Sequence, residues 1–152
     1  MTIYLVRHAK AGSRSGWDRP DDQRPLSKPG RRQADAIADG LAEAAPSRII
    51  SSPYVRCRQT VDPLAARLRL PVELSDALAE GAPLDDTRAL LSKVGDETAV
   101  LATHGDVIGW LLNDIARSGV ILGDDRLEKG SIWILELEAG VVATAEYRPP
   151  PA

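Results

Sequence analysis

Hydrophobic and polar positions follow two different periods along this chain, and these periods predict its strands and helices. Short runs of apolar and β-branched residues are typical of buried strands, whereas apolar positions three and four residues apart are typical of amphipathic helices. Strands are expected over residues 2–6, 48–51, 71–74, 98–102, 132–137 and 141–147, and helices over about 28–44, 55–68, 86–94 and 106–118. Strands and helices therefore alternate through most of the sequence.

Turn and cap residues mark where these elements begin and end. Ser27 is a typical helix N-cap, and Pro29 lies in the first helical turn, where its missing N–H does no harm. Pro63 is expected to kink or interrupt the second helix. Ala139 and Gly140 separate the last two strands and predict a β-hairpin.

The order of the elements predicts an α/β fold. We expect a three-layer sandwich, in which helices flank a mostly parallel central sheet and the chain finishes in a C-terminal β-hairpin. One domain is expected over residues 1–148, followed by an extended, proline-rich tail at 149–152. The polar segment 8–26 is a long loop for so small a domain, and loops of this length usually carry function.

Size and composition favour a globular protein with an ordinary core. The 152 residues are 43% hydrophobic and 27% charged, so the chain can bury a core without disulfides or structural metals. Cys57 is the single cysteine, so no internal disulfide can form, and this fits a reducing compartment. The N-terminus lacks the features of a secretory signal, and no apolar run is long enough to span a membrane. A cytoplasmic location is therefore expected.

Charge and aromatic content narrow the classes of partner. The net charge is −3, whereas nucleic acids and anionic membranes select proteins with a basic face. Aromatic residues make up 4% of the chain and phenylalanine is absent, so platforms for stacking bases are scarce. The 15 arginines outnumber the 4 lysines, which indicates either a compositional bias or binding of phosphate by guanidinium groups. We expect neither nucleic-acid nor membrane partners, and the sequence predicts no oligomeric state.

Both histidines of the chain follow expected strands directly. His8 comes after the first strand together with Arg7, and His104 comes after the fourth strand together with Gly105. Ligands of open α/β sheets bind outside the carboxyl ends of the strands. If the first and fourth strands are neighbours, the two imidazoles face each other. A third strand end, at 51–52, leads into a helix that carries Arg56, and helix N-termini favour anions.

Four segments carry a family resemblance. They are Arg7-His8-Ala9, Arg24-Pro25-Leu26-Ser27 with Gly30 and Gln33, Ser51-Ser52-Pro53 with Arg56, Gln59 and Thr60, and Thr103-His104-Gly105. In this order they resemble the motifs of the histidine phosphatase superfamily over nearly the whole chain. The Arg-His-Ala start resembles the short bacterial phosphohistidine phosphatases and the phosphatase half of certain Nudix-type nucleotide hydrolases. Lys129-Gly130-Ser131 and the 55–60 segment are closer to the second group, although no Nudix box is present.

The resemblance and the chemistry of the residues together assign roles. His8 is expected to attack phosphorus as a neutral ring, with its other nitrogen held by an acceptor such as a backbone carbonyl. Arg7, Arg56 and His104 are expected to surround the transferred phosphoryl group, and their charge also disfavours protonation of His8. The resemblance implies no metal ion and no other cofactor.

The remaining candidates each have a second interpretation. Glu80 is the candidate general acid, and a solvated loop carboxylate is the alternative. Cys57 is either an activated thiol or a buried packing residue. The candidates for substrate binding also include residues that can simply face solvent: Lys10, Ser13, Arg14, Arg24, Arg58 and Gly105.

Function is therefore expected to be phosphatase chemistry. The leading hypothesis is a metal-independent phosphatase that hydrolyses phosphomonoesters or phosphoanhydrides through a phosphohistidine on His8, with a nucleotide among the candidate substrates. The alternatives are a protein phosphohistidine phosphatase and a non-catalytic phosphate-binding module. A phosphomutase is disfavoured because mutases of this superfamily are longer. A deep basic pocket would favour nucleotide polyphosphates, and a shallow groove would favour a phosphohistidine protein as the partner.

Overall fold

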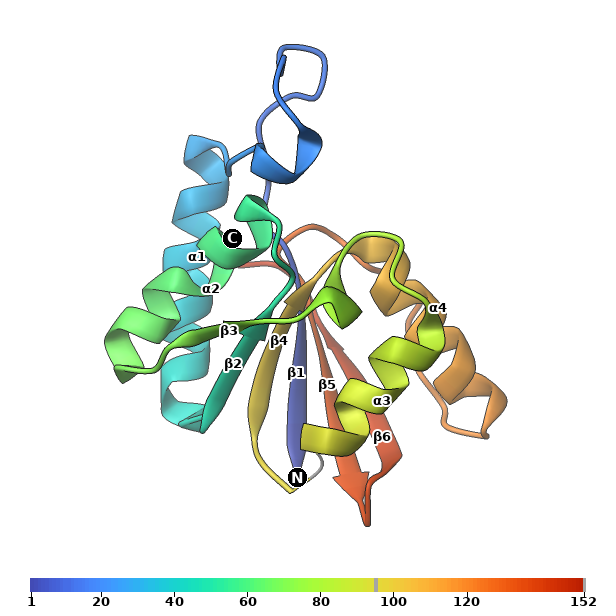
Figure 1. The fold of residues 1–152 in the computed structure, drawn as a ribbon. Coiled ribbons are helices and arrows are strands. Elements are labelled where there is room, and N and C mark those ends of the chain that lie inside the picture. Colours follow the sequence, from blue (N-terminus) through green and yellow to red (C-terminus); the bar gives the residue numbers. More distant parts are fainter. Residues whose placement is uncertain (95, 152) are drawn as a thin grey trace.

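The computed structural model describes residues 1–94 and 96–151, and within them the strands form one six-stranded mixed sheet (Figure 1). The strands are β1 (Thr2–Arg7), β2 (Arg48–Ser51), β3 (Val72–Leu74), β4 (Ala99–Thr103), β5 (Ile132–Glu138) and β6 (Val141–Arg148). Their order across the sheet is β3-β2-β4-β1-β5-β6. β1 to β4 pair in parallel. β5 pairs antiparallel with β1, and β6 pairs antiparallel with β5, so β5 and β6 form the expected C-terminal hairpin.

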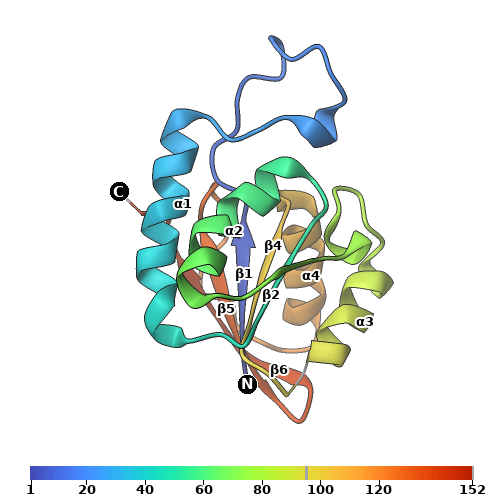
Figure 2. The ribbon, with the colours of Figure 1, turned by 60° about the vertical axis from the view of Figure 1, so that its left-hand side comes forward.

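Two pairs of helices cover the two faces of this sheet, as Figure 2 shows. The helices are α1 (Lys28–Leu41), α2 (Val55–Leu68), α3 (Leu84–Val94) and α4 (Gly105–Arg117), and short 3₁₀ turns lie at Asp21–Gln23, Ala42–Ala44 and Asp76–Leu78. Neighbouring strand residues point to opposite faces, so Ile49 packs in the α1/α2 core and Ile50 in the α3/α4 core. The three-layer α/β sandwich predicted from the sequence is confirmed.

The predicted cap of α1 is confirmed, and of the two expectations for Pro63, a kink or an interruption of α2, the interruption is wrong. The backbone N–H of Gly30 donates to Ser27 Oγ at 3.2 Å, so Ser27 is the N-cap. α2 runs unbroken through Pro63, although a proline inside a helix lacks one backbone hydrogen bond. Val61 and Leu64, on either side of the proline, are fully buried in the α1/α2 core. We attribute the continuity of the helix to this packing.

Parallel pairing brings the chemically interesting strand ends to one edge of the sheet. β1 and β4 pair up to Arg7 opposite Thr103, and β4 and β2 pair up to Ala102 opposite Ser51. The residues that follow these strands therefore emerge side by side. The long segment 8–26 rises above this edge and closes on itself through an antiparallel bridge between Ala11 and Leu26 (Figure 1).

Two sequence-based expectations lie beyond these observations. The limits of the domain, 1–148, and the tail at 149–152 stay predictions, and residue 152 lies outside the described residues.

Among the helices of residues 1–94 and 96–151, none has the length and apolar character needed to cross a membrane.

Candidate active site

A cavity of about 660 Å³ opens at the carboxyl edge of the sheet. This volume lies in the range of small-molecule binding sites. Its lining includes the cationic side chains of Arg7, Arg14, Arg24, Arg56 and Lys129, the carboxylates of Glu80 and Asp106, and both histidines of the chain. The cavity is therefore a basic pocket within an acidic protein.

His8 lies at this edge with its ring in one fixed orientation. The side chain is 6% exposed, and Nδ1 donates to the carbonyl of Ala9 at 2.8 Å. The Ala9 backbone is held in turn, because its N–H donates to Thr60 Oγ1 at 2.9 Å. With the proton on Nδ1, the neutral ring keeps a lone pair on Nε2. A backbone carbonyl is the acceptor expected from the chemistry of a histidine nucleophile.

His104 faces His8 from the start of α4, with ring centroids 5.5 Å apart. Its Nε2 lies 2.8 Å from Ser52 Oγ, whereas its Nδ1 is buried and has no partner within the described structure. Because Ser52 Oγ already accepts the N–H of Tyr54 at 3.2 Å, its own proton is available to Nε2. With Ser52 as the donor to Nε2, the proton of the neutral His104 ring lies on Nδ1, and in this tautomer Nδ1 is a free donor.

Burial keeps both histidines neutral. The pKa of His8 is lowered to about 4, mainly by burial and further by the charges of Arg56, Arg7 and Lys129, against a rise from the Ala9 hydrogen bond. The pKa of His104 is lowered to about 3, again mainly by burial and further by His8 and Arg56. At neutral pH the cavity therefore holds two uncharged imidazole rings.

Nuclear magnetic resonance titration of the two imidazoles will test this electrostatic picture. We expect both rings of the folded protein to titrate well below pH 6.5, with His8 near pH 4, and both to titrate near 6.5 in urea. Because the folded pKa values lie below the unfolded ones, the free energy of unfolding falls as the pH drops from about 6.5 towards 4. A folded-state midpoint near 6.5 for either ring would contradict the assignment.

Arg56 is fixed by its outer nitrogens and leaves its inner one free. The side chain is 1% exposed, and Nη1 and Nη2 donate to the carbonyl and the carboxylate of Asp21 at 2.9 and 3.0 Å. Its guanidinium lies 4.9 Å from the ring centroid of Tyr54, which contacts His104 edge-on. Nε of Arg56 is buried without a partner.

Arg7 shows the same arrangement. Its Nη1 donates to the carbonyl of Leu127, and its Nε is buried without a partner. The guanidinium lies against Gly105, where an added Cβ would approach it to 2.9 Å, so a larger residue at this position would displace the Arg7 side chain.

Three unpaired buried donors thus surround one cavity: Arg7 Nε, Arg56 Nε and His104 Nδ1. In the described residues, Ser131 Oγ is the one further buried side-chain atom without a partner. An unsatisfied buried donor costs about 1–3 kcal/mol, and such groups usually mark a functional site. Donors of this kind suit the oxygens of an oxyanion.

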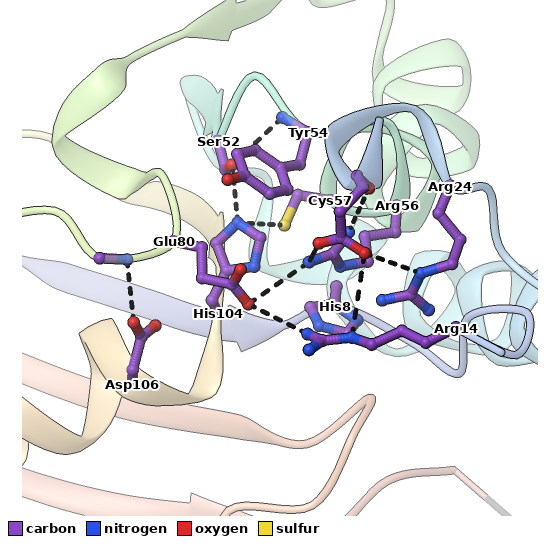
Figure 3. A network of polar contacts seen from close by, with 12 residues as sticks. His8, Arg14, Arg24, Ser52, Tyr54, Arg56, Cys57, Glu80, His104 and Asp106 are labelled. Carbon is purple, nitrogen blue, oxygen red and sulfur yellow. Dashed lines mark hydrogen bonds and ion pairs between the residues drawn. The ribbon is translucent and has the colours of Figure 1, made fainter. Parts of the chain in front are cut away.

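Glu80 lies at the mouth of the cavity on a loop that is fixed at both sides. Its Oε1 lies 3.4 Å from Arg56 Nη2 and 3.5 Å from Arg14 Nη2 (Figure 3). The N–H of Gly81 donates to Asp106 at 2.9 Å, and Thr103 Oγ1 donates to the carbonyl of Leu78 at 2.6 Å. The carboxylate is therefore held in the lining of the cavity.

Sequence reasoning missed Asp21, which organises the arginines. Its carboxylate accepts from Arg24 at 3.1 Å and from Arg56 at 3.0 Å, and it lies 3.8 Å from Arg14. Burial raises its pKa, but the hydrogen bonds and charges of Arg24 and Arg56 outweigh burial, so the pKa lies below its usual value. The available signal was the charge cluster at 18–22, which looks like ordinary loop polarity.

The other sequence candidates divide into two groups. Ser13, Arg14, Arg24 and Gly105 line the cavity. Lys10 and Arg58 are exposed and are not among its lining residues.

The structure decides between the two interpretations of Cys57 and adds Lys129 to the cavity. Cys57 is fully buried and burial raises the pKa of its thiol to about 12, so it packs in the core and the activated-thiol interpretation is wrong. Lys129, noted in the sequence for its family resemblance alone, lines the cavity. Within residues 1–94 and 96–151, no cluster of His, Cys, Asp or Glu side chains is arranged to hold a metal ion.

Comparison with known proteins identifies the class to which this fold and site belong. Residues 3–83 match the model of the histidine phosphatase superfamily (branch 1). The chain is also 35% identical, over 99% of its length, to the 8-oxo-(d)GTP phosphatase of Mycolicibacterium smegmatis. The chain therefore belongs to the histidine phosphatase superfamily, and it spans 48% of the length of that relative.

Solved structures agree with this classification at the level of the fold. The structure of the protein histidine phosphatase SixA complexed with tungstate superposes with a TM-score of 0.77 at 19% identity, covering 98% of this chain and 95% of that one. The native structure of mycobacterial glucosyl-3-phosphoglycerate phosphatase Rv2419c gives a TM-score of 0.72 at 18% identity, covering 97% and 95%.

Proposed function

We propose that this protein hydrolyses phosphate esters or anhydrides through a phosphohistidine on His8, without a metal ion. The observation that carries the proposal is the set of three buried, unpaired N–H donors, on Arg7, Arg56 and His104, beside a histidine whose Nε2 lone pair is free. Membership of the histidine phosphatase superfamily supports the same chemistry.

The first step transfers the phosphoryl group to the enzyme. The lone pair of His8 Nε2 forms the N–P bond, and the electrons of the breaking P–O bond go to the leaving oxygen, which Glu80 protonates. The positive charge that develops on the ring is stabilised by the carbonyl of Ala9, which accepts the hydrogen bond from the Nδ1–H group.

The second step releases phosphate. Glu80, now a base, removes a proton from water, the water oxygen attacks phosphorus, and the electrons of the N–P bond return to His8. Throughout, Arg7, Arg56 and His104 stabilise the charge on the equatorial oxygens. A unit charge about 4 Å from such an oxygen contributes about 4 kcal/mol at an effective dielectric constant near 20.

For the substrate we propose a small phosphorylated molecule of the nucleotide class. A relative of 35% identity is named for the dephosphorylation of 8-oxo-(d)GTP, and the cavity has the volume of a small-molecule site. A phosphohistidine protein is the alternative, because the fold is also that of SixA. A cytoplasmic location and the absence of nucleic-acid and membrane partners stay predictions from the sequence.

Trapping the phosphoenzyme in excess chelator will test the proposed chemistry. We expect turnover of p-nitrophenyl phosphate to continue in EDTA, and a phosphate label that is stable in base and labile in acid to map to His8. Activity that requires added Mg²⁺ would contradict the proposal. So would tight binding of phosphate without any turnover, which is the behaviour of a non-catalytic binding module.

A further inference from the structure

Lys129 is a cation of the cavity that the proposed chemistry does not use. Among the described ion pairs, Asp21 and Glu80 are shared by Arg14, Arg24 and Arg56. Asp106, which lines the cavity together with Glu80, accepts backbone N–H groups. No carboxylate of the described structure forms an ion pair with Lys129, and the unpaired donors of the reacting phosphoryl group lie on other residues.

The backbone that carries Lys129 is attached directly to the nucleophile. The N–H of Gly130 donates to the carbonyls of Arg7 and His8, both at 3.1 Å, and Gln33 donates to the carbonyl of Lys129 at 3.4 Å. Gly130 has a φ of +83°, and an added Cβ would lie 3.1 Å from the Gln33 side chain, so the turn requires glycine. The backbone of Lys129 is therefore fixed relative to His8, and its exposed side chain lines the same cavity as His8.

The surroundings of Lys129 are strongly electropositive. Its pKa is lowered by burial and by the charges of Arg7, Arg24, Arg14 and Lys10. Its own charge also contributes to the lowered pKa of His8, and both residues line the same cavity. An anion bound between Lys129 and the neighbouring arginines would relieve this repulsion.

We propose that Lys129 forms a second phosphate subsite next to the reacting phosphoryl group. The substrate class it selects is the phosphoanhydride, such as a nucleoside diphosphate or triphosphate, in which the leaving group is itself a phosphate. This inference rests on the proposed function. When His8 Nε2 bonds to the terminal phosphorus, the electrons of the broken bond go to the bridging oxygen, and Lys129 stabilises the departing phosphate.

The test compares two substrates that share a base and a sugar. For the Lys129→Gln variant we expect the ratio of kcat/KM for GDP to kcat/KM for GMP to fall about 10- to 100-fold, because one charge-assisted contact is lost. Lys129→Arg is expected to restore most of the ratio. The matched control is Lys93→Gln, which removes an exposed lysine of α3 that is not among the cavity-lining residues and should leave both values unchanged.

The outcomes separate this inference from the proposed function. An equal loss with both nucleotides, no loss with either, or a wild-type preference for GMP over GDP would overturn the second subsite, even while the label on His8 persists. Phosphoenzyme formation from p-nitrophenyl phosphate but from neither nucleotide would also overturn the second subsite, whereas failure to form any phosphoenzyme from p-nitrophenyl phosphate would overturn the phosphohistidine chemistry.

Discussion

Replacing His8 with alanine is expected to lower kcat by about 10⁴-fold or more and to abolish the labelled phosphoenzyme. Removal of a covalent nucleophile costs on this scale, because the remaining groups stabilise a reaction that no longer has its attacking atom. Nε2 is the free nitrogen of the His8 ring, because Nδ1 donates to the carbonyl of Ala9. The thiol of Cys57 is not an alternative nucleophile, because it is buried and its pKa is raised. Steady-state kinetics and phosphate labelling in EDTA will measure both effects.

Binding provides the internal control for this variant. Arg7, Arg56 and His104 keep their own partners when His8 is shortened, so the His8→Ala protein is expected to bind inorganic phosphate with a Kd similar to that of the wild type. Retained binding with lost turnover separates a catalytic failure from an unfolded variant. Activity within about tenfold of wild type would show that phosphate transfer takes another route.

The principal residues of the site were predictable because their positions follow from strand topology. Each of Arg7, His8 and His104 lies at or just after the end of a parallel strand, β1 or β4, and parallel strands present these ends at one edge. The helical period also decides between two neighbouring arginines. Arg56 is buried and Arg58 is exposed because two residues turn about 200° around the axis of α2.

Asp21 and Lys129 escaped prediction because both lie in loops, where no period relates one position to another. Asp21 binds Arg56 across 35 residues, and Lys129 sits next to a glycine that binds the backbone of His8 from the other end of the chain. A charged loop residue is usually solvated, so its sequence alone favours the wrong interpretation. In both cases only the tertiary fold shows that the charged side chain lies beside the other residues of the cavity.

Replacing Glu80 with glutamine is expected to produce a loss that depends on the leaving group. A positioned general acid contributes about 10²–10⁴-fold when the leaving group is a poor one. We therefore expect kcat/KM to fall about 10²- to 10³-fold for GMP, whose ribose oxygen needs a proton, and less than about tenfold for p-nitrophenyl phosphate, whose leaving oxygen needs none. Kinetics with both substrates will measure the contrast.

The structure also offers a different role for Glu80, and the same measurement separates the two. Its carboxylate lies 3.4 Å from Arg56, so its loss can disturb the arginine that holds the phosphoryl group. That effect would lower kcat/KM equally for both substrates, because each presents the same phosphoryl group to Arg56. Glu138→Gln, which changes an exposed carboxylate at the end of β5, is the matched control and should leave both rates unchanged. A leaving-group dependence confined to Glu80→Gln therefore identifies proton donation, and a uniform loss would reassign Glu80 as a positioning residue for Arg56.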